Sequence, residues 1–261
     1  MKNLRKYGDK PFRVAVIHGG PGAPGEMAPV ARELSFVAGV LEPLQTASSL
    51  EGQVHELKTV LENNAALPIN LIGFSWGATL SFIFAARYPS IMRKLILIGS
   101  PPYEEKYAAN ITLTRLTRLS DEKRAEALSL MENLNYPSAA DKNTLMARLG
   151  NLLVQADSYD PLPHDDEMLK CQYDVFLSVW EQAAHFRSSG KLLELGKSIK
   201  CPVVAIHGDY DPHPAAGVEE PLSRVLKDFR FVLLEKCGHR PWLERNARNR
   251  FYNILKQELA S

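Results

Sequence analysis

Short apolar runs alternate with longer helical patterns along most of this chain. Continuous apolar runs rich in valine and isoleucine are typical of parallel strands that are covered on both faces. They occupy residues 12–18, 69–74, 94–98, 203–207 and 229–234, with 40–44 as a weaker candidate. Helical patterns occupy residues 27–36, 50–63, 76–88, 219–227 and 242–259. The repeated strand–helix order predicts an α/β fold whose mostly parallel sheet has about six strands, with helices on both faces.

A helical, charged segment separates two groups of these strands. The strand at 94–98 is followed by about a hundred residues before the next strand signal at 203. An insertion at this place is expected over the carboxyl ends of the strands, where open α/β sheets bind ligands. We therefore predict a core made of residues 1–101 and 199–261, and a helical lid or cap made of residues 102–198. A helical decoration without a gating role is the alternative.

Charge and cysteine content limit the partners and the cellular setting. Lysine plus arginine number 31 and aspartate plus glutamate 30, and no basic stripe is present, so nucleic-acid binding is not expected. No run approaches the ~18–20 apolar residues of a membrane-spanning helix, and the first residues do not resemble a secretion signal. The three cysteines, Cys171, Cys201 and Cys237, lie far apart, which argues against a disulfide framework or a paired-cysteine metal site. We predict a cytoplasmic protein, a monomer or a homodimer, that acts on a small molecule.

The pentapeptide GFSWG at 73–77 carries the first chemical signal. It follows the apolar run 69–72 and opens the predicted helix 76–88, which is the strand–turn–helix setting of a GxSxG nucleophile turn. The flanking glycines permit a strained turn that lifts the serine hydroxyl to the sheet edge, and the helix N-terminus favours developing negative charge. Ser75 is therefore the candidate nucleophile.

A serine nucleophile needs a general base and a carboxylate that orients this base. The strand at 203–207 runs into Gly208-Asp209-Tyr210-Asp211-Pro212, and Cys237-Gly238-His239 follows the last strand. Ser75, Asp211 and His239 occur in the order Ser…Asp…His that is stated for α/β-hydrolases. Asp209 is an alternative to Asp211, because either could end that strand. His207 and His213 are weaker alternatives to His239.

A glycine-rich turn, HGGPG at 18–22, directly follows the first strong strand. Such a turn exposes backbone N–H groups, and it matches the HGG-type loop that supplies part of an oxyanion hole. Gly20 and Trp76 are the predicted amide donors, and His18 is a candidate for substrate binding. A plain β-turn is the alternative interpretation.

These motifs together resemble the α/β-hydrolase superfamily, and within it the proline iminopeptidase branch, which pairs an HGGPG loop with a G-x-S-W-G turn. GDYDP at 208–212 looks like the acid loop of that family, with Asp211 as the acid, and Gly238-His239 looks like its histidine loop. The resemblance covers about 12–101 and 199–259. It implies that the acid is Asp211, and it does not extend to the predicted lid.

Aminopeptidases of this branch hold the free ammonium of the substrate with acidic residues of a helical cap. Glu181 is the candidate here, in a segment, 178–181, that is loosely similar to part of that cap. Other acidic residues could supply the carboxylate, although a solvated surface explains them equally: Asp165, Asp166, Glu167 and Asp174. Only about a dozen residues precede the first strong strand, so the antiparallel hairpin with which many relatives begin is not expected. That edge is predicted to be capped differently or to pair with another subunit.

The predicted reaction is serine hydrolysis through an acyl-enzyme, which needs no metal or organic cofactor. The substrate is expected to be a small ester, thioester or amide, with an N-terminal prolyl peptide as one option. The same scaffold resembles carbon–carbon and hydroxynitrile lyases, which keep the three residues, and ligand receptors with vestigial turnover. These are the two alternatives from other functional classes.

Overall fold

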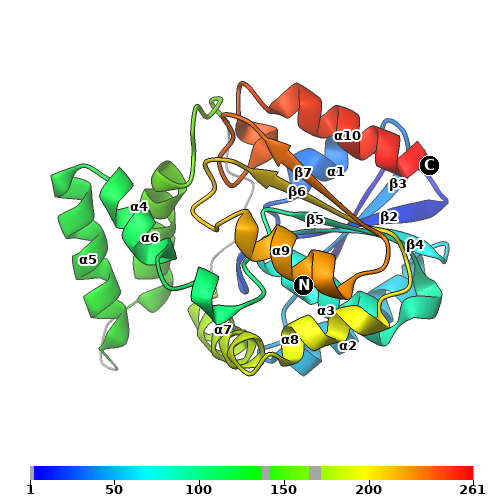
Figure 1. Cartoon of the computed structure of the whole chain (residues 1–261), viewed down its shortest axis with the longest axis horizontal. Helices are drawn as coiled ribbons and strands as arrows, with labels where there is room; N and C mark the ends of the chain where they lie inside the picture. The colour runs from blue at the N-terminus through cyan, green and yellow to red at the C-terminus, as the bar shows by residue number, and fades with distance from the viewer. Residues whose placement is uncertain (1–2, 137–140, 165–171, 261) are drawn as a thin grey trace.

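A sheet of seven strands forms the centre of the molecule (Figure 1). The computed structural model of the chain describes residues 3–136, 141–164 and 172–260, and these contain the order β1-β3-β2-β4-β5-β6-β7. Strands β2 to β7 pair in parallel, and β1 pairs antiparallel with β3. Their bounds are β1 Leu4–Tyr7, β2 Phe12–Ile17, β3 Gly39–Pro43, β4 Ile69–Phe74, β5 Met92–Ile98, β6 Val203–Gly208 and β7 Phe229–Leu234. The predicted mostly parallel α/β sheet is confirmed.

Strand β1 was not predicted. The sequence indicated about six strands and no antiparallel element before the first strong strand, whereas the sheet has seven strands and β1 is antiparallel to β3. Its sequence, Leu-Arg-Lys-Tyr, has no apolar run, and its side chains are only partly covered. The pairing is supported by the buried Glu42 of β3, which accepts a hydrogen bond from the Tyr7 hydroxyl at 2.7 Å and pairs with Arg5 at 3.5 Å. The edge of β3 is therefore covered by the chain's own first residues, for a reason that a search for apolar runs does not detect.

Helices cover both faces of the sheet (Figure 1). Figure 1 shows α1 and α10 on one face and α2, α3 and α9 on the other, in agreement with the two apolar clusters of the core. Their bounds are α1 Ala28–Leu34, α2 Leu50–Asn64, α3 Trp76–Arg87, α9 Ala216–Val225 and α10 Arg248–Ala260. Short 3-10 turns lie at Pro89–Ile91, Glu105–Tyr107, Leu195–Ser198 and Pro241–Leu243. The predicted helix at 242–259 thus begins only at Arg248, after a separate turn.

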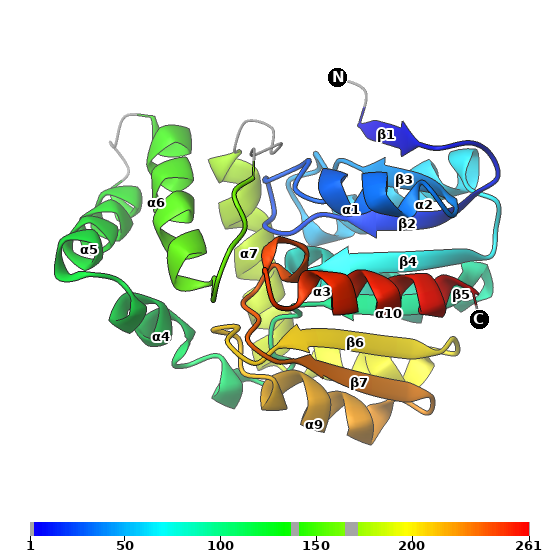
Figure 2. The ribbon, with the colours of Figure 1, turned by 90° about the horizontal axis from the view of Figure 1, so that it is seen from above.

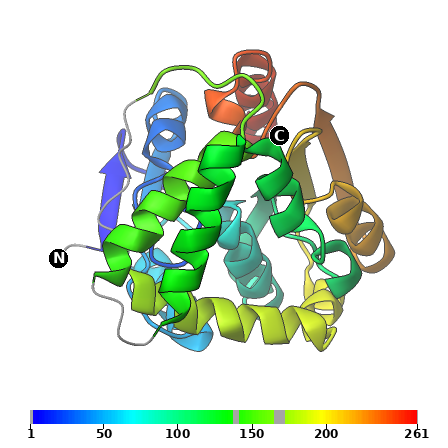
Figure 3. The same ribbon diagram turned by 90° about the vertical axis from the view of Figure 1, so that its left-hand side faces the viewer.

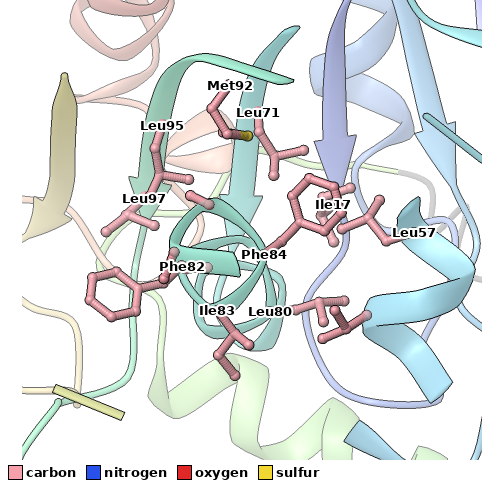
Figure 4. Packing of buried hydrophobic residues seen from close by; sticks show 14 of the residues in the cluster. Ile17, Leu57, Leu71, Leu80, Phe82, Ile83, Phe84, Met92, Leu95 and Leu97 are labelled. Atoms are coloured by element: carbon pink, nitrogen blue, oxygen red, sulfur yellow. The ribbon is translucent and has the colours of Figure 1, made fainter. Parts of the chain in front are cut away.

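Helix α3 is the centre of the larger cluster. Its residues from Trp76 to Ala86 are buried, so the helix is enclosed on all sides, as expected of a largely apolar helix inside a core. Figure 4 shows Phe82 and Phe84 of this helix among leucine side chains of the sheet and of α2. This packing fixes the N-terminus of α3, and therefore the turn before it, against the carboxyl end of β4.

The predicted insertion, residues 102–198, packs in two ways. Its helices are α4 Ile111–Arg118, α5 Asp121–Asn135, α6 Lys142–Ala156, α7 Tyr173–Ser188 and α8 Lys191–Glu194. Helices α5 and α6 share a small apolar cluster of their own, whereas α7 contributes Val175, Val179 and Ala183 to the main core. In Figures 2 and 3, α4, α5 and α6 stand beyond the carboxyl ends of the strands. We call α4, α5 and α6 the cap.

Buried apolar side chains of these helices belong to the clusters described above. Within the described part of the chain, no helix combines the length and the hydropathy that crossing a bilayer requires.

Candidate active site

Ser75 occupies a strained turn between β4 and α3. Its φ is 50° and its ψ −117°, and its N–H donates to the Ile98 carbonyl at 2.9 Å. A Cβ on Gly73 would collide with the carbonyl of Gly77, and a Cβ on Gly77 would collide with the carbonyl of Ile17. The two glycines of GFSWG are therefore required by backbone contacts, and the turn exposes the serine at the sheet edge.

One of the two predicted oxyanion donors directly follows this serine in the chain, and the other lines the same cavity. Trp76 is the first residue of α3, so its N–H is not used by the helix ladder, while its indole donates to Gln53 Oε1 at 2.9 Å. Gly20 has a φ of 32° and lines the same cavity as Ser75. This arrangement places a helix N-terminus and a glycine turn beside the serine, where negative charge would develop.

His18 is hydrogen-bonded to the backbone of the glycine turn. Its ring is fully buried, with Nδ1 2.7 Å from the Gly19 carbonyl and Nε2 accepting from the Gln45 N–H at 3.3 Å. These partners fit a neutral ring that donates from Nδ1, and burial lowers its pKa. Since its partners are both backbone groups, His18 positions the turn, and it is not among the residues that line the cavity beside Ser75.

Asp211 and His239 are in direct contact. His239 Nδ1 lies 2.6 Å from Asp211 Oδ2, and the Asp211 side chain is fully buried. Asp209 instead accepts the backbone N–H groups of Lys236 and Cys237, each at 3.0 Å, and so caps the turn that leads to the histidine loop. Of the two carboxylates that the sequence left open, only Asp211 reaches His239.

Two further histidines surround the same carboxylate. Asp211 Oδ1 accepts from the N–H of His213 at 2.9 Å and lies 2.8 Å from its Nδ1, and His207 Nε2 lies 3.6 Å from Oδ2. Burial alone would raise the pKa of Asp211, but the three neighbouring imidazoles hold it well below its usual range. Burial also lowers the pKa of His213 to about 4. Asp211 is thus kept ionised, and His213 neutral, at neutral pH.

The same grouping has the spacing of a metal site. Ligand atoms of Asp211, His213 and His239 lie within 4.8 Å of one another. Hydrogen bonds between one carboxylate and two rings account for this closeness without an ion.

Gly99 is a site residue that sequence reasoning missed. Its φ is 49°, and a Cβ there would lie 3.0 Å from His239 Nδ1 and 3.2 Å from Asp211 Oδ2. The glycine at the end of β5 therefore makes room for the Asp211–His239 pair. The signal was present in the sequence as a glycine directly after a central strand.

The cap is bound to the loops that carry these residues. The Asp157 carbonyl, at the end of α6, accepts the N–H of His239 at 2.8 Å. Arg118, at the end of α4, donates to the Tyr210 carbonyl at 2.7 Å, and its guanidinium lies 3.7 Å from the centre of the Tyr210 ring. The buried Glu244 accepts from the N–H groups of Gly238 and Tyr159. Both the acid loop and the histidine loop are therefore fixed partly by cap residues.

A cavity of about 320 Å³ lies between the cap and the sheet edge. Ser75 and His239 line it together with Gly20, and apolar side chains of α6 and Phe176 of α7 form the opposite wall. Its volume is in the range of small-molecule sites.

Four charged side chains also line this cavity, and they form two pairs. Arg115 binds both carboxylate oxygens of Asp157, at 2.8 and 2.7 Å. Arg240 pairs with Glu26 at 2.5 Å. Because each carboxylate has an arginine partner, the charges of the cavity wall are balanced.

Glu181, the predicted ammonium-binding residue, does not line the cavity. It is exposed on α7, as is Asp174, whereas Phe176 of the same helix faces the cavity. Asp165, Asp166, Glu167 and Cys171 lie outside the described residues. Cys201 and Cys237 are buried free thiols.

Comparison with known proteins agrees with this architecture. A family model described as the alpha/beta hydrolase fold matches residues 45–245. Among curated proteins, the chain is 25% identical over 208 residues to human monoacylglycerol lipase ABHD6 and 26% identical to the rat protein. These matches cover 76% of this chain but only 57% of either relative, so the chain matches little more than half their length.

Solved structures show the same fold at lower identity. VinJ superposes with a TM-score of 0.70 at 18% identity, covering 98% of this chain and 94% of VinJ. Proline iminopeptidase of Mycobacterium smegmatis has a TM-score of 0.63 at 17% identity, covering 98% and 93%. Paleococcus ferrophilus monoacylglycerol lipase has a TM-score of 0.62 at 16% identity, covering 98% and 97%. The family model confirms the predicted superfamily, while the proline iminopeptidase branch is one similarity among several. The chain belongs to the α/β-hydrolase fold family.

Proposed function

We propose that this protein is a serine hydrolase that acts through an acyl-enzyme. The observation that carries the proposal is the Asp211–His239 contact of 2.6 Å, whose histidine lines the same cavity as Ser75 in its strained turn. In the proposed reaction His239 removes the proton of the Ser75 hydroxyl, which attacks the substrate carbonyl. The N–H groups of Gly20 and Trp76 stabilise the tetrahedral oxyanion, whose collapse breaks the bond to the leaving group as His239 returns the proton to it. Water, deprotonated by His239, then attacks the acyl-enzyme and releases the acid, and the proton returns to Ser75.

Asp211 has an orienting role in this scheme. Its carboxylate fixes the proton of His239 on Nδ1, which leaves Nε2 free to act as the base, and it stabilises the imidazolium that forms. The hydrogen bonds that His213 donates to the second carboxylate oxygen hold Asp211 in place. An ionised Asp211 at neutral pH is what this role requires.

We infer that the substrate is a neutral ester with an apolar chain. The cavity wall opposite Ser75 is largely apolar, and its two carboxylates are already neutralised by arginines. A free ammonium would need a carboxylate partner when buried, and breaking either ion pair to supply one is unfavourable. An N-terminal peptide is therefore a less suitable substrate for this cavity than an ester. The similarity to monoacylglycerol lipases is consistent with this proposal.

The test compares two families of chromogenic substrates. We expect hydrolysis of p-nitrophenyl esters, little hydrolysis of aminoacyl-naphthylamides including the prolyl compound, and loss of the ester activity in Ser75→Ala. Faster hydrolysis of the prolyl amide than of any ester would contradict the substrate assignment but not the serine mechanism. Ester hydrolysis that survives Ser75→Ala would contradict the mechanism, and activity on neither family would return the lyase interpretation.

A further inference from the structure

Helix α6 contributes apolar side chains both to a cluster shared with α5 and to the cavity that contains Ser75. Leu149, Leu152 and Ala156 belong to the small cluster that α6 shares with α5. Six residues of α6 line the cavity opposite Ser75, and four of them lie three or four positions from the central Gly150, as on one side of a helix. This stripe consists of Met146, Ala147, Gly150, Asn151, Leu153 and Val154, of which Met146 and Leu153 also pack against the cluster shared with α5. Together with Phe176 of α7, the stripe forms the wall opposite the nucleophile, with a glycine at its centre.

Backbone conformation does not explain the glycine at 150. Its φ lies outside the left-handed region, and it sits in the middle of a helix, where glycine is destabilising by roughly 0.5–1 kcal/mol relative to alanine. Gly190, by contrast, has a φ of 74°, which accounts for glycine at that position.

Crowding does not explain it either. A Cβ built on Gly150 would meet no heavy atom of the described residues within 4 Å outside its own stretch of helix. By contrast, Gly73 and Gly77, which flank Ser75 in its turn, lie directly against neighbouring backbone. The space beside Gly150 is therefore open, and it belongs to the cavity that contains Ser75.

We propose that Gly150 is a specificity-determining residue whose missing side chain keeps open the part of the cavity that receives the apolar chain of the ester. This inference rests on the proposed hydrolase function and adds to it the residue that limits chain length. Met146 and Val154 lie one turn away on either side along the stripe, so a chain passing Gly150 contacts apolar groups on both sides. A side chain at position 150 fills the space that the distal methylenes of a long chain need.

The experiment measures kcat/KM for two ester series of increasing chain length, p-nitrophenyl esters from acetate to decanoate and alkyl acetates from ethyl to decyl. The variants Gly150→Ala, Gly150→Met and Gly150→Leu form a size series. In the series whose chain reaches α6, we expect Gly150→Leu to reduce kcat/KM for the longest chains about 10- to 100-fold. The two-carbon ester should change less than threefold, and Gly150→Ala should raise Tm with little effect on the profile.

Gln155→Leu is the matched control, because Gln155 is exposed on the same helix and does not line the cavity. It should leave both profiles unchanged. If Gly150→Leu does not fold, Gly150→Met replaces it, because methionine is unbranched and favourable in helices. We expect Gly150→Met to lower kcat/KM for the longest chains as well, by a smaller factor. Chain-length profiles of folded Gly150 variants that run parallel to the wild type in both series would overturn the inference and leave the hydrolase proposal standing. A wild type that cleaves no ester of either series contradicts the proposed function, and this inference falls with it.

Discussion

The sheet core and the cap are stabilised by different interactions. Strands β4 and β6 are buried along their whole length, and the two clusters beside the sheet are apolar throughout. Among the described residues the cap has one small apolar cluster, and it meets the catalytic loops through hydrogen bonds to their backbone. The core is therefore specified by continuous apolar patterns, and the cap by individual polar residues that meet the catalytic loops.

This difference indicates how the two regions divide the proposed work. The core supplies Ser75, Asp211 and His239 at the carboxyl ends of β4, β6 and β7. The cap supplies the opposite wall of the cavity, and it also holds the acid and histidine loops through Arg118 and Asp157. Substitutions in the core site should therefore abolish turnover, whereas those in the cap should change turnover by less and alter substrate preference.

The largest effect is expected from Asp211→Asn. The asparagine leaves the shape of the site intact but no longer fixes the proton of His239 on Nδ1, so kcat should fall on the order of 10⁴-fold. Asp209→Asn is the matched control, because Asp209 bonds backbone N–H groups and does not touch His239. It should change kcat less than tenfold, as measured on a p-nitrophenyl ester. Equal losses in the two variants would mean that Asp211 is not the orienting acid.

A smaller effect is expected where the cap meets the acid loop. Arg118→Leu removes the hydrogen bond to the Tyr210 carbonyl, one residue before Asp211, and small displacements of catalytic groups cost up to about 10²-fold. We expect kcat/KM to fall about 10-fold or more with the protein still folded. Arg148→Leu breaks a cap ion pair between α6 and α5 that is remote from the loops, so it should leave kcat/KM unchanged. If both variants keep full activity, the cap does not position the acid loop.

The smallest effect concerns stability at acid pH. His213 has a pKa of about 4 in the fold, below the ordinary value of 6.5, so the unfolded chain binds more protons between these pH values. The stabilisation that comes from keeping His213 neutral is therefore fully present above pH 6.5 and is lost as the pH falls towards 4. The lowered pKa of His18 acts in the same direction.

Urea unfolding at pH 7, 5.5 and 4 measures this effect in the wild type and in His213→Asn. The wild type should lose ~1–3 kcal/mol more unfolding free energy on acidification than the variant, which has no imidazole to protonate there. Parallel pH curves for the two proteins would show that His213 is not held neutral by burial.

Sequence reasoning reached much of the core because its signals are local. The turn at Ser75 and the loops after β6 and β7 each follow an apolar run, so their side chains could be assigned to one sheet edge before any contact was known. The structure places Asp211 against His239 and both near the cavity of Ser75, although their catalytic roles stay predictions. The choice between Asp209 and Asp211 needed the loop conformation, which directs one carboxylate to backbone and the other to His239.

Residues whose role depends on distant contacts were not found in this way. Arg118 acts through Tyr210, 92 residues away in the chain, and a single sequence contains no signal for that contact. Gly99 could be noticed as a glycine directly after a central strand, but its contacts with Asp211 and His239 could not be predicted. Glu181 was chosen for its charge, but the periodicity of α7 does not tell which side meets the cavity, and there Phe176 does. Strand β1 was missed because its pairing is supported by the polar contacts of Tyr7 and Arg5.

The most direct test of the central proposal is covalent labelling of the nucleophile. The folded protein is treated with a fluorophosphonate, and intact mass and peptide mapping locate the adduct, with Ser75→Ala as the control. The account predicts one adduct per chain, on Ser75, that is absent from Ser75→Ala and forms much more slowly in Asp211→Asn. A folded wild-type protein that stays unlabelled, or an adduct that persists in Ser75→Ala, would contradict it.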